Sequence, residues 1–214
     1  MRKILLSMRV TESDSYSEFR NSIAYEYIEF FEKLNFLVIL VPNNSTAIDK
    51  YFDDKIELVV LSGGNNVDPS LYQGDETLTD VYPERDGTEK EMFNTALKKN
   101  IKILAICRGF HAINVFLGGS ISHNIKDHVN RFHKLLSNRS YLHNQETNSF
   151  HNQGIAMSDL FIQDKGVLLA TTEDGFVEAA TNTDRSILGI QWHPERQRKA
   201  FDIELIQNFL KGSL

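Results

Sequence analysis

Three residues that could together carry out acyl transfer stand well apart in the sequence. They are the single cysteine, Cys107, and the pair His193 and Glu195. A thiolate can attack a carbonyl, an imidazole can remove and return the proton near neutral pH, and a carboxylate can hold the ring in one tautomer. A lone cysteine is more often a small buried apolar side chain. The histidine and the carboxylate nevertheless favour a cysteine nucleophile within a catalytic triad.

The segments around these residues are typical of strands and helices. Residues 101–106 form an apolar, β-branched run of strand length, and residues 112–117 after the cysteine indicate a helix that ends at two glycines. A cysteine in such a strand-to-helix turn lies above the carboxyl ends of the strands and at a helix N-terminus, which favours a thiolate. Another apolar run, 186–192, ends directly before His193. Nucleophile and base thus each follow a predicted strand.

The two donors that a tetrahedral oxyanion needs can also be identified. One is the amide N–H of Arg108, directly after the nucleophile, and the other belongs to the pair Gly63 and Gly64. These glycines follow a predicted strand, residues 57–61, which we expect to neighbour the strand of Cys107. Adjacent glycines allow a positive φ and expose backbone N–H groups. The sequence therefore predicts an oxyanion hole made by Gly64 and Arg108.

The order of the predicted elements indicates an α/β fold. Strands alternate with helices in the first half, which predicts a mostly parallel sheet with helices on both faces, and the last third predicts short strands and a closing helix. A capping box at Thr88 is the predicted start of the third helix. The predicted strands are residues 4–8, 36–41, 57–61, 101–106, 167–172, 176–180 and 186–192, and the predicted helices are 18–34, 47–52, 88–100, 112–117 and 199–210.

Three further segments are predicted to lie outside this regular alternation. Residues 11–17 are polar and are expected to form a loop. Residues 69–85 form a longer polar connection, and a loop of that length is more often a functional lid than slack. Residues 135–150 are predicted to form one or two strands of a small antiparallel extension.

Length and composition restrict the class of protein. At 214 residues the chain can bury one good core, so we expect a single domain over residues 1–214. One cysteine excludes a disulfide framework and fits a reducing cytosol, which favours a cytoplasmic protein. The first apolar run is too short for a signal peptide, and no run approaches the roughly 20 residues of a membrane span. A net charge of −6 argues against a nucleic-acid partner.

A locally basic, histidine-rich stretch, residues 120–140, follows the predicted nucleophile helix. It contains Lys126, Arg131, Lys134 and Arg139, together with His123, His128 and His133. No ordered ligand spacing such as H-E-x-x-H appears among these histidines, so we expect no metal. A second basic run, Arg196, Arg198 and Lys199, follows Glu195. Both stretches could form a positive rim for a phosphate-bearing ligand, or could pair with surface carboxylates.

Several longer motifs resemble the class I glutamine amidotransferase superfamily, in particular its stand-alone γ-glutamyl hydrolase branch of the peptidase C26 type. The resemblance extends from about residue 60 to 195. It is carried by Leu61-Ser62-Gly63-Gly64, Val67-Asp68-Pro69, Leu71-Tyr72, Arg85-Asp86-Gly87-Thr88-Glu89, Ile106-Cys107-Arg108-Gly109, the segment 114–119, Asn148-Ser149-Phe150-His151-Asn152-Gln153, Asp174-Gly175-Phe176-Val177-Glu178-Ala179 and Gly189-Ile190-Gln191-Trp192-His193-Pro194-Glu195.

The resemblance implies a three-layer, flavodoxin-like fold and hydrolysis of a γ-glutamyl amide by Cys107, His193 and Glu195 through a thioester, without a cofactor. It also implies a set of substrate-binding residues, in which His111 stands where the family usually has glutamine. The set is Gly63, Gly64, Arg108, His111, Ser149, Phe150 and His151.

Three functions are compatible with the motifs. The first is a γ-glutamyl hydrolase that needs no obligatory synthetase partner and acts on a small molecule: a folate polyglutamate, γ-glutamyl-aminobutyrate or a nucleotide-linked γ-glutamyl phosphoramidate. The resemblance favours the last of these, γ-glutamyl-CDP-amidate of capsule phosphoramidate synthesis. The second function is the glutaminase subunit of a biosynthetic amidotransferase. The third is a non-catalytic relative, which is disfavoured because all three triad residues are present.

Overall fold

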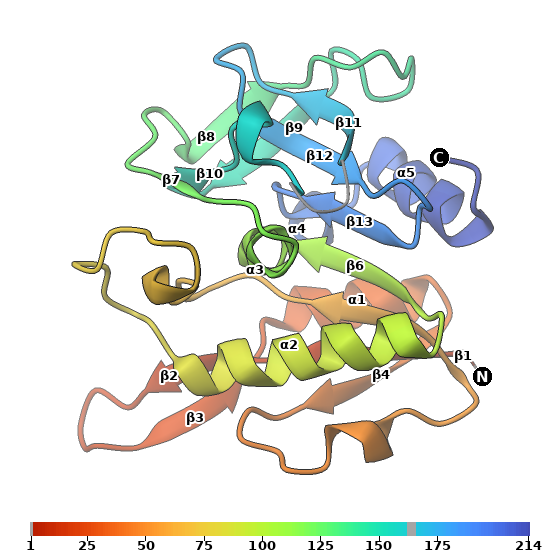
Figure 1. Cartoon of the computed structure of the whole chain (residues 1–214). Helices are drawn as coiled ribbons and strands as arrows, with labels where there is room; N and C mark the ends of the chain where they lie inside the picture. The colour runs from red at the N-terminus through yellow and green to blue at the C-terminus, as the bar shows by residue number, and fades with distance from the viewer. Residues whose placement is uncertain (1, 162–165) are drawn as a thin grey trace.

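A seven-stranded sheet forms the centre of the computed structural model, which describes residues 2–161 and 166–214 (Figure 1). Across the sheet the strands run in the order β11 (Val167–Thr171), β12 (Val177–Thr181), β13 (Ile187–Ile190), β6 (Lys102–Ile106), β5 (Ile56–Leu61), β1 (Arg2–Ser7) and β4 (Phe36–Val41). All neighbouring pairs from β13 to β4 are parallel, whereas β12 is antiparallel to both of its neighbours. The predicted mostly parallel sheet is thereby confirmed, including the pairing of the glycine-loop strand β5 with the nucleophile strand β6.

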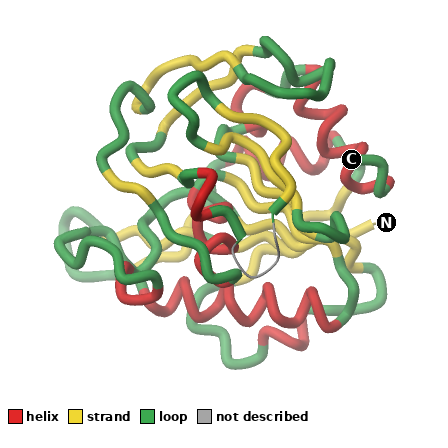
Figure 2. The backbone as a smooth tube through the Cα atoms, turned by 45° about the horizontal axis from the view of Figure 1, so that its top comes forward, coloured by secondary structure: helices red, strands yellow, loops and turns green. Residues whose placement is uncertain are grey.

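Helices cover both faces of this sheet (Figures 1 and 2). On one face lie α1 (Tyr25–Lys33) and α5 (Ala200–Lys211), whose aromatic residues pack on Ile4 and Leu6 of β1. On the other face lie α2 (Pro83–Lys98) and α3 (Arg108–Phe116), in the core cluster that contains Leu5. Successive strand residues point to opposite faces, so one apolar strand serves both cores. The result is the expected three-layer arrangement.

Three small two-stranded sheets lie beside the main sheet. The first pairs β2 (Arg9–Glu12) with β3 (Phe19–Ser22), the second pairs β7 (Ser122–His123) with β10 (Gln153–Gly154), and the third pairs β8 (Val129–Lys134) with β9 (Glu146–Phe150). The β8–β9 hairpin is the predicted antiparallel extension, but it begins before residue 135. Short 3₁₀ turns occupy Ile48–Tyr51, Pro69–Leu71 and Met157–Asp159, and a short helix α4 (Pro194–Gln197) precedes α5.

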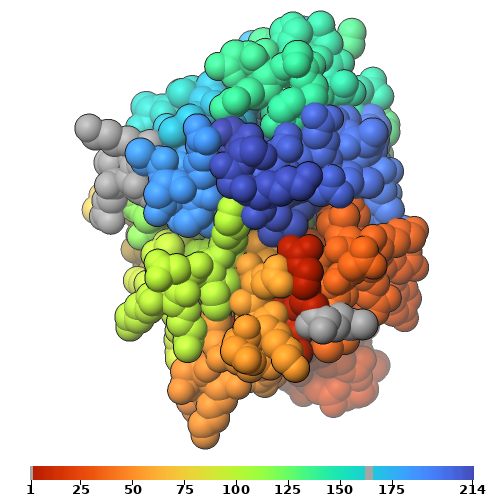
Figure 3. Space-filling model, turned by 90° about the vertical axis from the view of Figure 1, so that its right-hand side faces the viewer, coloured from red at the N-terminus to blue at the C-terminus, as the bar shows by residue number. Residues whose placement is uncertain are grey.

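The chain ends lie on one side of the molecule (Figures 1 and 3). The space-filling view shows the dark blue C-terminal segment next to the red beginning of β1. Among residues 2–161 and 166–214, no helix is long and apolar enough to cross a membrane.

The predicted helix over residues 18–34 is wrong in its first third. Residues Phe19–Ser22 form β3 instead, and α1 begins only at Tyr25. The apolar spacing that suggested a longer helix includes Phe19, which is 60% exposed and contacts the Tyr82 ring edge-on. An exposed aromatic side chain in that series mimicked a buried helical stripe, and it extended the prediction beyond the true helix start.

Two other helix starts also differ from the prediction. Helix α2 begins at Pro83 rather than at Thr88, so Thr88 and Glu89 lie buried inside the helix and do not form a capping box. Proline is well suited to the first helical turn because its missing N–H has no partner there in any case. Helix α3 begins at Arg108, directly after the cysteine, and not at Ala112.

Candidate active site

Cys107 occupies a tight turn between β6 and α3. Its backbone has φ 54° and ψ −112°, a strained conformation for a residue with a side chain. The Cys107 N–H donates to the Ile190 carbonyl at 2.7 Å, which ties the turn to β13. A Cβ atom on Gly109 would lie 2.2 Å from the Leu61 carbonyl oxygen, so only glycine lets α3 pass this close to β5.

His193 and Glu195 lie at the end of β13, the parallel neighbour of β6. The His193 Nδ1 atom is 2.6 Å from Glu195 Oε1, and both side chains are buried. The side chain of Asn148 bonds to the His193 backbone in both directions: its Oδ1 accepts from the N–H at 2.9 Å and its Nδ2 donates to the carbonyl at 2.8 Å. The imidazole is thus positioned by a carboxylate at the ring and by an amide at the backbone.

The charges of the cysteine and the histidine stabilise each other. Burial raises the pKa of the Cys107 thiol, but the positive charge and hydrogen bond of His193 and the N–H of Arg108 outweigh it, and the net pKa is lowered. Burial lowers the pKa of His193, but the Cys107 thiolate and Glu195 outweigh it and the net pKa is raised. At neutral pH this arrangement favours a thiolate–imidazolium pair, which is the reactive form of a cysteine nucleophile.

The glycine loop after β5 is held by a tyrosine from α1. The Gly63 N–H donates to the Tyr27 hydroxyl at 3.0 Å, and burial raises the pKa of Tyr27, so this hydroxyl stays protonated. With Gly63 engaged, the next amide of the loop is that of Gly64, whose φ is 82°. The second donor, the Arg108 N–H, lies next to the thiol and helps to lower the pKa of Cys107.

A buried ion network supports the loop from behind. The guanidinium of Arg85 donates to the carbonyls of Ser62 at 2.8 Å, of Gly63 at 3.1 Å, and of Gly64. Glu89 accepts from Arg85 at 3.0 Å and also from the Arg108 guanidinium. The side chain of Arg108 therefore points into this network, also bonding Asp86, and only its backbone amide is placed to serve an oxyanion.

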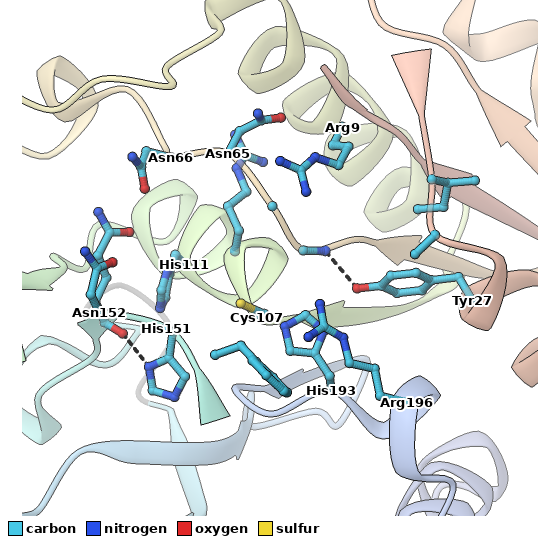
Figure 4. A pocket seen from close by; sticks show the side chains of 17 residues that line it. Arg9, Tyr27, Asn65, Asn66, Cys107, His111, His151, Asn152, His193 and Arg196 are labelled. Carbon is cyan, nitrogen blue, oxygen red and sulfur yellow. Dashed lines mark hydrogen bonds between the residues drawn. The ribbon is translucent and has the colours of Figure 1, made fainter. Parts of the chain in front are cut away.

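A cavity of about 270 Å³ opens above the cysteine (Figure 4). Of the predicted substrate-binding residues, all but Ser149 line it. Ser149 is buried, and its hydroxyl donates to the His128 carbonyl. The lining residues with predicted roles are Gly63, Gly64, Cys107, Arg108, His111, Phe150, His151 and His193, and they are joined by Arg9, Tyr27, Asn65, Asn66 and Arg196 among others.

His111 presents an acceptor to this cavity. Its Nε2 lies 2.8 Å from Gln191 Oε1, and a proton on Nε2 would satisfy this contact and leave Nδ1 as an acceptor. Nδ1 is buried without a hydrogen-bond partner in the described part of the chain. Burial lowers the pKa of His111 to about 4, so the ring is neutral at physiological pH. A neutral acceptor at this position suits a substrate ammonium group.

The positive rim differs from the predicted one. Only Arg196 of the two basic stretches lines the cavity, with its guanidinium 4.3 Å above the Phe150 ring. Arg198 pairs with Glu29 at 2.7 Å, and Lys126 lines a separate cavity. The second cation at the active-site cavity is Arg9, which the sequence reasoning missed because it follows a strand without a recognisable motif. Arg9 Nε is buried and has no hydrogen-bond partner among the described residues.

Three histidines come together in the structure despite their irregular spacing in the sequence. One nitrogen of each of His128, His133 and His151 lies within 4.8 Å of the others. The sequence spacing alone therefore does not exclude a metal site.

Comparisons with known proteins agree with the motif resemblance. The family model described as Peptidase C26 matches residues 4–195. A glutamine amidotransferase-like protein of Lactococcus lactis is 30% identical over 91% of each chain. The gamma-glutamyl-CDP-amidate hydrolase of Campylobacter jejuni is 29% identical over 95% of each chain.

The fold is likewise shared with a solved structure. A glutamine amidotransferase from Thermotoga maritima superposes with a TM-score of 0.62 at 16% identity, over 98% of this chain and 84% of the other. The predicted flavodoxin-like, glutamine amidotransferase-type fold is thus confirmed. Together with the family match over most of the sequence, these similarities show that the chain belongs to the peptidase C26 family of glutamine amidotransferase-like hydrolases.

Proposed function

We propose that the protein hydrolyses a γ-glutamyl amide through a thioester on Cys107. The observation that carries this proposal is the placement of an activated cysteine, in a strained turn, against His193 and two backbone donors. In the first half-reaction Cys107 Sγ attacks the γ-carbonyl carbon, and the amides of Gly64 and Arg108 stabilise the oxyanion. His193 protonates the departing nitrogen as the C–N bond breaks, which leaves a γ-glutamyl thioester.

The second half-reaction reverses these roles. His193, now neutral, takes a proton from water, the hydroxide attacks the thioester, and glutamate leaves as the Cys107 thiolate re-forms with protonated His193. Glu195 holds the ring through Nδ1 and stabilises the imidazolium in both halves. The cavity supports recognition of the glutamyl end: His111 Nδ1 is an acceptor for the α-ammonium group, and Arg9 is a donor for a carboxylate.

This proposal is tested by acid quenching during turnover of a γ-glutamyl amide. Mass spectrometry should find a γ-glutamyl adduct on the peptide that contains Cys107, and free glutamate should appear at the same rate as the amine. Glutamate release without any adduct, at quench times within the first turnover, would contradict a covalent route. A reaction that proceeds only with a separate synthetase present would favour the glutaminase-subunit alternative.

For the leaving group we propose a phosphate-bearing amine, with γ-glutamyl-CDP-amidate as the substrate and capsule phosphoramidate synthesis as its context in the cytoplasm. Arg196, the cation at the cavity that the glutamyl end does not use, supports this choice because a guanidinium group can bind two phosphate oxygens at once. The similarity to the Campylobacter jejuni enzyme supports it as well. The discriminating experiment is a panel of γ-glutamyl compounds with and without a phosphate. A kcat/KM that favours γ-glutamyl-aminobutyrate over the nucleotide-linked compound would overturn the choice.

A further inference from the structure

Three histidines meet at the base of the β8–β9 hairpin, outside the proposed triad. His128 precedes β8, His133 lies on β8 and His151 follows β9. Their ring centroids are 4.3 Å apart for His128 and His133, 5.0 Å for His128 and His151, and 6.4 Å for His133 and His151. The hairpin itself brings them together, because the His151 N–H donates to the His128 carbonyl at 3.1 Å.

A strand irregularity explains why the sequence spacing concealed this cluster. Side chains five positions apart, as His128 and His133 are, point to opposite faces of a regular strand. The pairing of β8 with β9 shifts register between Val129 and Arg131, and such a bulge adds one residue to one strand. The extra residue returns both side chains to the same face.

Each ring directs one nitrogen into the cluster without a hydrogen-bond partner. The unpartnered buried atoms are His128 Nδ1, His133 Nε2 and His151 Nε2. The His128 and His151 side chains are 1% and 3% exposed, so solvent does not satisfy these nitrogens. Leaving a buried polar atom without a hydrogen-bond partner destabilises the folded state. Three unpartnered nitrogens at one point therefore indicate a ligand that binds all three.

The other nitrogens of two of these rings are held from outside. His128 Nε2 bonds to Asp174 Oδ2 at 2.8 Å, and His151 Nδ1 bonds to the Gln153 carbonyl at 2.7 Å (Figure 4). A proton on the outer nitrogen leaves the inner nitrogen with its lone pair exposed. Histidine ligands of metals are oriented in this same way, by a carboxylate or a backbone carbonyl on the far side of the ring.

We propose that His128, His133 and His151 form a binding site for a divalent transition-metal ion of the zinc type. Three neutral imidazoles are a common ligand set for zinc, with Zn–N distances of about 2.0–2.1 Å, which places the nitrogens about 3.3 Å apart. The present separations of at most 4.8 Å require only small side-chain rotations to reach that geometry. A water molecule can occupy the fourth position, and the carboxyl group of Glu178, whose Oε1 is 3.6 Å from His151 Nε2, lies beside it.

The proposed metal site adjoins two cavities. His128 and His133 also line a second cavity of about 660 Å³, where three carboxylates (Asp127, Glu173 and Asp174) outnumber the two lysines. His151 in turn lines the active-site cavity. A bound ion would therefore fasten both ends of the β8–β9 hairpin to one wall of the active site. This inference does not depend on the proposed reaction.

The test is metal binding by the full-length protein carrying Cys107→Ala, because a cysteine beside a histidine could itself bind zinc. The chain is freed of metal with a chelator and titrated with Zn²⁺ by calorimetry and with Co²⁺ by visible absorption. We expect one equivalent of Zn²⁺, the intense visible bands of four- or five-coordinate Co²⁺, and an increase in Tm with zinc. Loss of one ligand, in a further His133→Ala substitution, should weaken zinc binding at least tenfold and remove the cobalt bands.

His143→Ala is the matched control, because His143 is an exposed histidine on the connection between the same two strands. It should bind zinc as the parent does. His133 is only half-buried, and circular dichroism without metal will show whether the His133→Ala variant folds. If it does not fold, His133→Gln takes its place. Binding of less than half an equivalent of zinc, or equal affinity with and without His133, would overturn the proposal.

Discussion

The two walls of the active-site cavity are built in different ways. On the nucleophile side, groups at the ends of β5, β6 and β13 are placed by the backbone of the central sheet, and nearly every residue there is buried. On the opposite side, Phe150 and His151 come from the β8–β9 hairpin, whose β8 strand is mostly exposed. The packing of the central sheet fixes the positions of its strand ends, whereas a surface hairpin tolerates substitution. Under the proposed function, the difference predicts that substitutions on the sheet side affect catalysis more than substitutions on the hairpin do.

The largest effect is expected at the backbone-built wall. Cys107→Ala should reduce the kcat for glutamate release by roughly a thousandfold or more, because the nucleophile is unique. The fold should persist, with Tm within a few degrees of the parent, since the side chain removed is small. His143→Ala, on the hairpin side, is the control and should retain full activity. Glutamate release by Cys107→Ala close to the parent rate would exclude the thioester.

The second prediction compares the buried network with an exposed cation of the hairpin. Glu89→Gln leaves Arg85 and Arg108 without their shared counter-charge, and breaking a buried ion pair in this way costs about 3–5 kcal/mol. Arg131→Ala, on exposed β8, should change the free energy of unfolding by less than about 0.5 kcal/mol. Urea denaturation measures both. Equal losses in the free energy of unfolding from the two substitutions would contradict a difference in construction between the two walls.

The third prediction separates the roles of His193 and Glu195. His193→Asn should reduce kcat nearly as much as loss of the thiol, because the imidazole moves protons in both half-reactions, and Glu195→Gln should reduce it less. Glu195 favours the imidazolium, so its neutralisation should lower the pKa of His193, and because its charge opposes the Cys107 thiolate, the same change should also lower the pKa of the thiol.

The pKa shifts of His193 and Cys107 predict the direction in which the pH range of the reactive pair moves. The reactive pair exists above the lowered pKa of the thiol and below the raised pKa of the imidazolium. In Glu195→Gln both limits of this pH window should move to lower pH, which the rate of iodoacetamide labelling against pH will report. A greater loss of kcat from Glu195→Gln than from His193→Asn would invalidate the assignment.

The smallest effect is expected where side chains alone build the cavity. Arg196→Ala should raise KM about tenfold for a phosphate-bearing γ-glutamyl substrate, because it removes one charge-assisted contact at the cavity mouth. The increase in KM should be smaller at high salt, where the charge is screened. For γ-glutamyl-aminobutyrate little should change. Arg198→Ala is the control, because Arg198 pairs with Glu29. The same change in KM for both substrates would argue against a phosphate contact.

How much of the structure the sequence predicts depends on whether a feature is determined by neighbouring residues or by residues far apart in the chain. The turn at Cys107, the glycine pair and the strand before His193 are local patterns, and the structure brings these elements to one cavity. The pairing of β5 with β6 also follows, because β-α-β connections leave few topologies. The γ-glutamyl hydrolase motifs are short and local, so the family could be identified as well.

Features that depend on long-range contacts were not predictable. The β3 strand was assigned to a helix because Phe19 continues a helical spacing, and only its partner strand β2 determines otherwise. Arg9 reaches the cavity from the loop side, far from any motif. The three histidines share a face only through a bulge that no local pattern announces. Ser149 was assigned to the substrate by its position in a motif, yet its hydroxyl bonds to a backbone carbonyl.

The bond from Gly63 N–H to the Tyr27 hydroxyl has a consequence for biosynthesis. The glycine loop is held by a helix that leaves the ribosome before Cys107, whereas His193 emerges after Cys107. A nascent chain therefore carries Cys107 for a time without the imidazole that lowers the pKa of the thiol. The thiol becomes fully reactive only when β13 pairs with β6, so it is less prone to alkylation or oxidation until that strand is in place.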